Sequence, residues 1–345
     1  MLPGFGGIWG NLVWTGCLIA GSIRYMCKAL QPVDPARSSG SGISSQVSRM
    51  VMGIIATSLL SWIPLIFAIS NLVRSSAFDE ALRAEMDKAS GKNLRAFAKT
   101  TAMLAGALLP LLAVLQNVLL YAEGGHFDIH GAYLCLWFPV AFVSLVVFLL
   151  VWKVSVLRVD DLRDRIQMMP TDLPGRWPEL ARDYRAVVKL VDDLWRGTGL
   201  SSAYTLIFAT DLMYVAFNTA FADADAQKFA GGSWVWIVRH SVGLCVGMYL
   251  WAQIHSRCVS SARAQTPSLL HAAKQQLCRV KQQDILDHLC FLRCVEGLKC
   301  GVEIPSVGLI SMKYVGPVTR LISIAVPVFF GIALRFAAAG RPGGF

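Results

Sequence analysis

Charged residues are scarce in this chain. Asp, Glu, Lys and Arg together make up 16% of its 345 residues, against about 25% in soluble globular domains. Hydrophobic residues make up 55%, and the mean hydropathy is +0.52. This balance argues against an ordinary soluble enzyme of the same length.

The chain also lacks the short motifs of common enzyme chemistry. It contains no HExxH, no Walker A sequence, no GxSxG, and no GxGxxG at a strand–helix turn. Its nine cysteines have no histidine partners at zinc-site spacings, so no catalytic residue, metal ligand or cofactor is predicted. Their odd number, with five from Cys258 onward, predicts reduced thiols on the cytosolic side. The first residues have no basic stretch and no small-residue cleavage site, which disfavours a cleaved signal peptide.

The sequence does contain apolar runs of about 20 residues, the length at which an α-helix crosses about 30 Å of hydrocarbon. The runs are continuous and do not alternate with polar residues, so they predict helices and not a β-barrel. The predicted fold is an all-α membrane protein with seven transmembrane helices, at residues 6–26, 50–73, 101–122, 131–153, 200–222, 233–255 and 315–336. Pro64, Pro110, Pro139 and Pro327 lie inside these spans, which neighbouring helices in a bundle tolerate.

Lys and Arg are distributed unevenly between the connections. The second, fourth and sixth connections hold 23 of them, whereas the odd-numbered connections and the C-terminal tail hold 7. By the positive-inside rule the N-terminus is then cytoplasmic and the C-terminus extracellular, the reverse of a G-protein-coupled receptor. The formal net charge of +10 is therefore attributed to topology, and no nucleic-acid partner is predicted.

Apolar residues at helical spacing continue beyond the spans. One stripe contains Leu180, Tyr184, Val187 and Val191, and a second runs from Leu269 through Leu286 and Leu289 to Val295. We expect spans 4 to 6 to extend into a cytosolic helical layer, residues 155–198 and 257–314, within one domain of residues 1–345. The stripes are compatible with packing on each other and with an assembly platform between subunits.

Aromatic and polar residues gather in the outer half of the predicted bundle, where spans 2 to 6 meet. Binding pockets combine aromatic walls with a few convergent polar groups. The candidate pocket residues are Gln116, Asn117, Tyr121, Tyr133, Trp137, Phe138, Asp211, Tyr214, Asn218, Trp236, Arg239 and His240. For any single aromatic residue, core packing or an interfacial belt is the alternative.

Asp211 is distinct because it lies in the middle of a span. A carboxylate there needs a partner inside the protein, and Arg239 is the predicted one. The pair is either a structural salt bridge or part of a ligand contact.

The seventh span carries one stripe at spacings of three or four, formed by Thr319, Ser323, Val326 and Phe330. Two hydroxyls followed by apolar residues suit a pore that is wet at its inner end and closed by a hydrophobic constriction. The alternative is packing of small hydroxyls between helices. Arg320 lies about 100° around the helix from Thr319, and we expect it to point into the cytosolic layer.

Residues 285–330 resemble the C-terminal signature of the arthropod gustatory receptor family, sister to the insect odorant receptors. In that family an aromatic-rich helix leads to a Gly, a Leu-Leu-type pair, and a Thr-Tyr-five-hydrophobics-Gln-Phe motif within span 7. Gly301, the pair Leu309–Ile310, and Thr319 are in step with the signature. The departures are Arg320 in place of Tyr, Val326 in place of Gln, and Pro327 in place of Phe.

The resemblance implies a ligand-gated, non-selective cation channel in the plasma membrane of chemosensory cells. It implies a homo- or heterotetramer whose pore is lined by span 7 of four related subunits and whose cytosolic layer holds the subunits together. A small-molecule tastant or other chemical ligand would enter from outside, and membrane lipid would surround the spans. One alternative is a non-conducting scaffold of the same fold. A secondary transporter is disfavoured, because no paired broken helices or inverted repeat is visible.

Overall fold

The computed structural model describes residues 8–30, 42–87, 91–122, 129–168, 176–220, 232–259, 267–277, 282–304, 307–317 and 320. In chain order the elements are α1 (Ile8–Leu30), α2 (Gly42–Arg74), α3 (Ser76–Asp87), α4 (Gly91–Ala122), α5 (Ile129–Gln167), α6 (Arg176–Asp192), the π-helix η2 (Asp193–Gly197), α7 (Leu200–Ala220), α8 (Gly232–Val259), α9 (Leu269–Gln276), the 3-10 turn η5 (Gln282–Asp284), α10 (Ile285–Gly297), β1 (Glu303–Ile304) and β2 (Gly308–Leu309).

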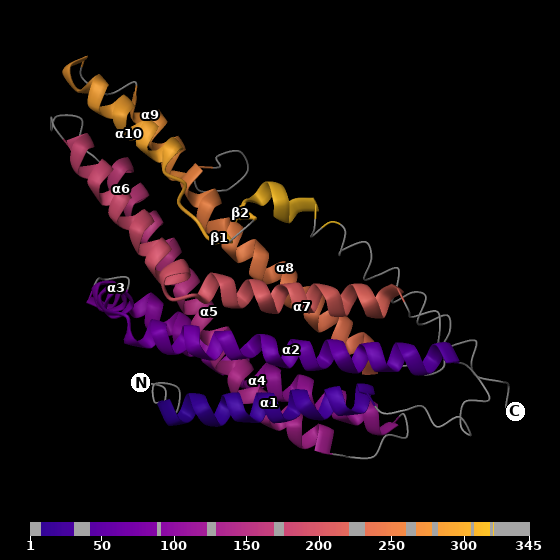
Figure 1. The fold of residues 1–345 in the computed structure, drawn as a ribbon. Coiled ribbons are helices and arrows are strands. Elements are labelled where there is room, and N and C mark those ends of the chain that lie inside the picture. The colour runs from indigo at the N-terminus through magenta and orange to yellow at the C-terminus, as the bar shows by residue number, and fades with distance from the viewer. Residues whose placement is uncertain are drawn as a thin grey trace, which may run out of the picture.

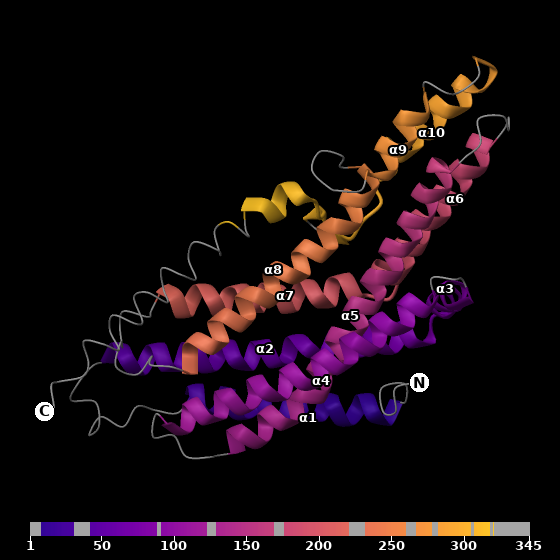
Figure 2. The same ribbon diagram turned by 180° about the vertical axis from the view of Figure 1, so that it is seen from behind.

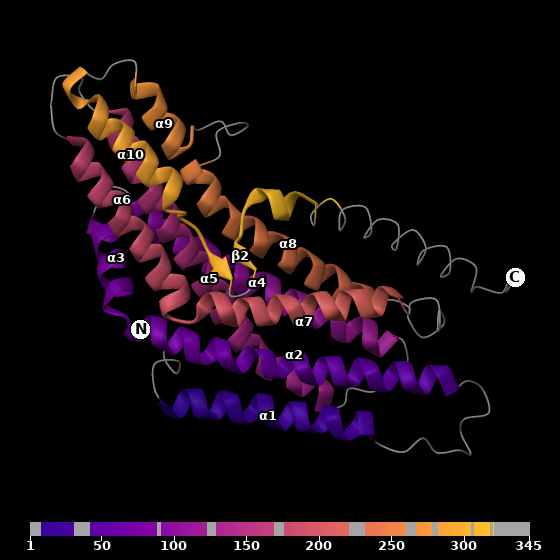
Figure 3. The same cartoon turned by 45° about the horizontal axis from the view of Figure 1, so that its top comes forward.

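The helices form two connected parts. α1, α2 and α7 lie side by side, and α4, α5 and α8 cross behind them to complete a bundle (Figures 1 and 2). α5 and α8 continue past the bundle, and α6, α9 and α10 pack around their far ends (Figure 3). We refer to α6, α9 and α10 together with those ends of α5 and α8 as the helical layer.

The predominantly helical architecture predicted from the sequence is confirmed. The first six predicted spans fall on α1, α2, α4, α5, α7 and α8, and the predicted span 315–336 lies almost wholly outside the described residues. Among the described segments, Ala56–Arg74 and Phe138–Gln167 are long and apolar enough to cross a membrane, and Leu200–Ala216 is apolar but shorter. Seven spans and their orientation stay predictions.

Proline does not end the long helices. Pro64, Pro110 and Pro139 lie inside α2, α4 and α5, as the sequence predicted. Each removes one backbone donor, and the neighbouring helices hold the segment straight enough to continue. α5 therefore runs for 39 residues, about 58 Å, which is longer than a bilayer core is thick.

The two parts differ in the side chains that they expose. Large apolar side chains are exposed around the bundle: Leu12, Val13, Ile19, Ile23, Phe67, Met103, Leu104, Leu108, Leu111, Val114, Val118, Leu206, Leu212, Met213, Val242, Val246 and Tyr249. On α6, by contrast, the exposed side chains include Arg176, Glu179, Arg182, Arg185 and Lys189. An exposed apolar surface of this extent on one part is the kind that water-facing proteins avoid.

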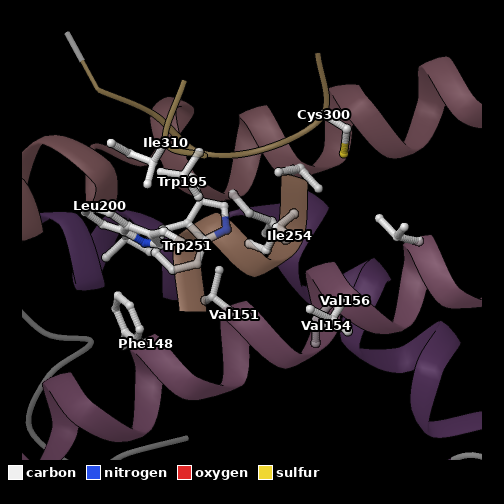
Figure 4. Packing of buried hydrophobic residues seen from close by; sticks show 14 of the residues in the cluster. Phe148, Val151, Val154, Val156, Trp195, Leu200, Trp251, Ile254, Cys300 and Ile310 are labelled. Carbon is white, nitrogen blue, oxygen red and sulfur yellow. The ribbon is translucent and has the colours of Figure 1, made fainter. Parts of the chain in front are cut away.

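An aromatic cluster forms the centre of the core where α5, η2, α7 and α8 meet (Figure 4). The rings of Trp195 and Trp251 stand at 90° with centroids 5.9 Å apart, and Phe148 lies 4.8 Å from Tyr204 in the same edge-to-face manner. The Trp195 Nε1–H donates to the hydroxyl of Ser155 at 3.2 Å, so its polar atom is satisfied in the core.

Ion pairs attach α3 and α8 to the charged end of α5. Arg158 Nε forms an ion pair with Glu85 Oε1 at 2.9 Å. Arg257 Nη1 lies 3.2 Å from Asp160 Oδ1. Because the Glu85 side chain is 2% exposed, breaking its pair would leave a carboxylate poorly solvated.

The first predicted stripe of the helical layer is buried, on the face of α6 that includes Trp177, Leu180, Tyr184, Val187 and Val191. The second stripe is only partly buried. This part of the chain forms two helices, α9 and α10, that pack against each other, and α10 buries His288, Phe291, Leu292 and Val295. Leu286 and Leu289, which the stripe included, are left exposed on α10.

Candidate functional site

Ionisable side chains meet inside the bundle where α7 packs against α8. Asp211 and Tyr214 are one turn apart on α7 and are 9% and 8% exposed. Arg239 and His240 are neighbours on α8. We call these four residues the charged cluster. A carboxylate and a guanidinium inside an apolar bundle mark a functional site by default, since neither would be kept there for packing alone.

The hydrogen-bonded partner of Asp211 is His240 and not the predicted Arg239. His240 Nδ1–H donates to Asp211 Oδ1 at 2.7 Å, and the Tyr214 ring lies 5.0 Å from the imidazole. Arg239 lies within electrostatic range of Asp211 and Tyr214. The prediction that Arg239 is the partner was therefore incomplete. One residue turns a helix by about 100°, and that rotation presents the imidazole to the carboxylate.

The position of Asp211 is fixed by its neighbour Thr210. The Thr210 hydroxyl donates to Ile207 O at 2.8 Å and lies 3.3 Å from the hydroxyl of Ser61 on α2. Ser61 in turn donates to Ser58 O at 2.6 Å. The charged cluster, formed by α7 and α8, thus lies next to a hydroxyl contact between α7 and α2.

The charged cluster combines the groups that recognise polar organic molecules. The Asp211 carboxylate accepts a hydrogen bond, the half-buried Arg239 guanidinium provides a positive charge, and Tyr214 adds an aromatic face with a hydroxyl. A ligand that forms a hydrogen bond with any of these groups would change the electrostatic interactions among them. These interactions are far stronger in a low-dielectric interior than in water.

Only part of the predicted pocket is described at the level of side chains. Phe138 is half-buried and stacks with Phe142 one turn along α5, with ring centroids 6.4 Å apart. Asp211, Tyr214, Arg239 and His240 are brought together. The remaining candidates have side chains outside the described part of the structure: Gln116, Asn117, Tyr121, Tyr133, Trp137, Asn218 and Trp236.

The predicted pore stripe lies outside the described residues. This holds for Thr319, Ser323, Val326 and Phe330 alike. Arg320 is described and is exposed. The pore assignment therefore stays a prediction.

A second group of contacts anchors the chain just before this last segment, at residues 298–310, which we call the joint. The Tyr184 hydroxyl donates to Leu298 O at 2.6 Å, and His255 Nδ1–H donates to Cys300 O at 3.1 Å. The thiols of Cys258 and Cys300 are in hydrogen-bond contact and both side chains are fully buried. This contact and burial raise the pKa of the Cys258 thiol well above its ordinary range, so it stays protonated at neutral pH.

The joint is completed by a short hairpin. β1 and β2 pair antiparallel with Glu303 opposite Leu309, and Ile310 N–H donates to Val302 O at 3.0 Å. A Cβ at Gly301 would lie 2.8 Å from Leu309 Cδ1 and 3.1 Å from His255 Cβ, so only glycine lets the hairpin approach α8 this closely. Gly301 belongs to the motif in the sequence, whereas its contact with α8 was not predicted.

The roles of His255 and Tyr184 were missed at the sequence level. Tyr184 was placed in a buried stripe, and nothing in that spacing indicates which carbonyl its hydroxyl meets. His255 ends a predicted span and has no partner at a motif spacing. Within the described ranges, no three His, Cys, Asp or Glu side chains converge as ligands of a metal ion.

No known protein-family model matches the chain, and no curated protein sequence matches it.

Proposed function

We propose that this chain is the subunit of a tetrameric, ligand-gated, non-selective cation channel of the gustatory-receptor type, located in the plasma membrane of chemosensory cells. The apolar exterior of the bundle supports insertion into lipid, and the charged surface of α6 supports a water-facing layer at one end. The charged cluster is the proposed ligand site, and the stripe Thr319, Ser323, Val326 and Phe330 is the proposed pore lining.

The observation that carries the proposal is that one unbroken helix, α8, bears Arg239 and His240 of the charged cluster as well as His255 and Cys258, which contact the joint. His240 and His255 are 15 residues apart on α8, which is about 22 Å of helix. A ligand that alters the Asp211–His240 contact would shift α8 as a rigid rod. His255 and Cys258 would carry that shift to Cys300, which lies 15 residues before the predicted seventh span begins at residue 315.

Assembly of several copies is supported by an apolar face on the helical layer. α10 exposes Ile285, Leu286 and Leu289, and Leu286 is 71% exposed. Exposed leucine side chains at this spacing, on the face of a helix that points away from the protein's own core, are typical of a helix–helix contact with another chain. In the proposed tetramer, a neighbouring related subunit would cover this apolar face of α10.

Patch-clamp recording tests the channel without knowledge of the ligand. Val326→Ser should place a polar group in the proposed constriction, remove its tendency to dewet, and give a constitutive cation current. Leu321→Ser, on the same helix but off the stripe, is the matched control and should give no such current.

The scaffold alternative has its own outcome in this experiment. It takes precedence if the protein reaches the membrane and purifies as a multimer but no variant along residues 319–330 conducts, alone or with a co-expressed related subunit. The apolar face of α10 is consistent with assembly of either a channel or a scaffold. The presence or absence of a cation current therefore distinguishes the two.

A further inference from the structure

The outward face of α4 changes character within about one helical turn. Arg95 and Lys99 are exposed and lie four residues apart. Beyond them the exposed large side chains are apolar, in the order Met103, Leu104, Leu108, Leu111, Val114 and Val118, each more than half exposed. We call these six residues the α4 stripe. From Met103 to Val118 it covers about 22 Å, most of the thickness of a hydrocarbon core.

The neighbouring helix α5 carries an aromatic and a basic residue at the height where the exposed surface of α4 changes from basic to apolar. α4 and α5 are antiparallel, with Phe97 beside Trp152 at a ring-centroid distance of 6.2 Å and Gly106 close to Phe142. Lys153 follows Trp152, and its Nζ lies 5.6 Å from the centre of the Phe97 ring. Trp152 and Lys153 end the predicted span 131–153, and tryptophan and lysine where an apolar run ends are typical of the membrane–water boundary (α4 and α5 are seen together in Figure 2).

The three cations surround the polar end of the α4 stripe. At about 100° per residue, Arg95 and Lys99 lie on one flank of the stripe, and Phe97 lies on the other flank, where it carries Lys153. Between these flanks the exposed surface is formed by the small side chains of Ala96 and Thr100.

No ion pair satisfies these cations within the described part of the chain. Arg83, Arg158 and Arg163 each lie within 4.0 Å of a carboxylate, whereas no such contact is formed by Arg95, Lys99 or Lys153. Three cations beside an exposed apolar stripe are complementary to a molecule with an anionic head and a hydrocarbon tail.

We propose that this corner of α4 and α5 is a binding site for an anionic phospholipid. The phosphate and any further negative headgroup lie between Lys99 and Lys153, with Arg95 at the edge, and an acyl chain follows the α4 stripe. The proposal rests on the membrane insertion included in the proposed function, and in the predicted topology the site faces the cytoplasmic leaflet. It does not depend on whether the protein conducts.

Native mass spectrometry of the detergent-purified protein tests the site. Equimolar phosphatidylglycerol and phosphatidylcholine with the same acyl chains are added, and the bound lipid is identified. The wild-type protein should retain phosphatidylglycerol preferentially. Because each basic residue near a headgroup contributes about 1 kcal/mol, each Lys or Arg removed should lower the preference about fivefold. Arg95→Gln/Lys99→Gln/Lys153→Gln should therefore abolish it.

The matched control removes the same charge from the helical layer. Arg176, Arg182 and Arg185 are exposed on α6, and their triple replacement by Gln should leave the lipid preference unchanged. Equal loss in this control, or an unchanged preference in the α4–α5 variant, would overturn the proposal. So would displacement of the lipid by inorganic phosphate beyond the effect of chloride at equal ionic strength, since the site would then recognise phosphate alone.

The outcome is separable from the proposed function. A protein that binds the lipid but carries no current loses only the channel assignment. A protein that alkaline carbonate washes out of membranes loses the membrane premise itself, before any lipid is counted.

Discussion

His288 is a buried imidazole whose surroundings favour its neutral form. Its ring stacks on Trp177 with centroids 3.8 Å apart and planes 9° apart, and Nε2–H donates to Ala273 O at 2.9 Å. Nδ1 is buried with no hydrogen-bond partner among the described residues. The indole face would attract a cation, but burial outweighs this and lowers the pKa of His288 below its ordinary value.

This lowered pKa predicts a loss of stability in acid. The unfolded chain binds a proton at His288 more readily than the folded chain, so the contribution is complete above about pH 6.5. It is lost as pH falls from there through the folded-state pKa. His288→Phe keeps a flat ring on Trp177 and cannot ionise. Thermal unfolding between pH 7.5 and 5 should therefore show a shallower acid slope for the variant. Equal slopes would show that His288 is not the group that titrates.

The charged cluster predicts strongly non-additive substitutions. Asp211→Asn removes the negative charge near Arg239 and replaces the carboxylate acceptor of His240 by a weaker neutral amide, and losing one charge of a buried pair costs about 3–5 kcal/mol. His240→Gln should also destabilise, but the double variant should lose less than the sum of the two, because both changes disrupt one contact. Thermal unfolding of the detergent-purified protein measures all three.

An exposed carboxylate provides the control for this cycle. Asp79 pairs with Arg83 on the surface of α3, where side chains are more than half exposed. Asp79→Asn should cost about 0.5 kcal/mol or less, since water already screens the pair. Additive losses for Asp211 and His240 would show that their hydrogen bond does not contribute to folding.

At the scale of elements, α7 and α8 cross closely at a glycine. A Cβ at Gly247 would lie 2.2 Å from Phe208 Cζ, and the Phe208 ring is itself packed 5.1 Å from Trp251. The ring cannot yield without disturbing the aromatic cluster. Gly247→Ala should thus destabilise the protein by about 1–3 kcal/mol through overpacking.

The same helix contains its own control. Gly243 lies one turn away with nothing within 4 Å of a built Cβ. Gly243→Ala should be neutral or stabilise by up to about 1 kcal/mol, because alanine is the better helix former. Gly247→Ala combined with Phe208→Leu should recover part of the lost stability. A Gly247→Ala protein that unfolds at the wild-type temperature would contradict the close crossing.

The elements that sequence periodicity predicted are those whose burial is set by their own spacing. The helices at the first six predicted spans follow from continuous apolar runs of about 20 residues, and the α6 stripe follows from apolar residues recurring at three and four. The π-helix at Asp193–Gly197, the positive φ of 81° at Gly199, and the hairpin at the joint were not predicted. Each depends on contacts with distant residues, such as Trp195 on Trp251, which no local pattern encodes.

The charged cluster shows the same limit at finer resolution. Asp211 and His240 were both named as pocket residues, because an intramembrane charge and an aromatic or imidazole ring are recognisable one by one. Which of Arg239 and His240 bonds to Asp211 depends on the rotation of α8 against α7. An error of one residue there is a turn of about 100°, well within the uncertainty of predicting where a helix begins.

At the scale of the whole molecule, the helix bundle and the helical layer have surfaces suited to different surroundings, apolar for the bundle and aqueous for the layer. The bundle exposes leucine, methionine and valine, and α6 exposes arginine, lysine and glutamate. α5 passes from one environment to the other, with Leu145 exposed near its middle and Arg165 near its end. In the proposed topology the helical layer lies on one side of the membrane and the α4–α5 connection lies on the other.

That arrangement makes topology the test of the whole architecture. An epitope inserted at residues 169–175, between α5 and α6, should be stained only after cells are permeabilised, because 23 Lys and Arg residues lie in the connections on that side. An epitope at residues 123–128, between α4 and α5, should be stained on intact cells. Staining of both epitopes on intact cells would show that α5 does not span the membrane, and reversed staining would invert the orientation that the charges predict.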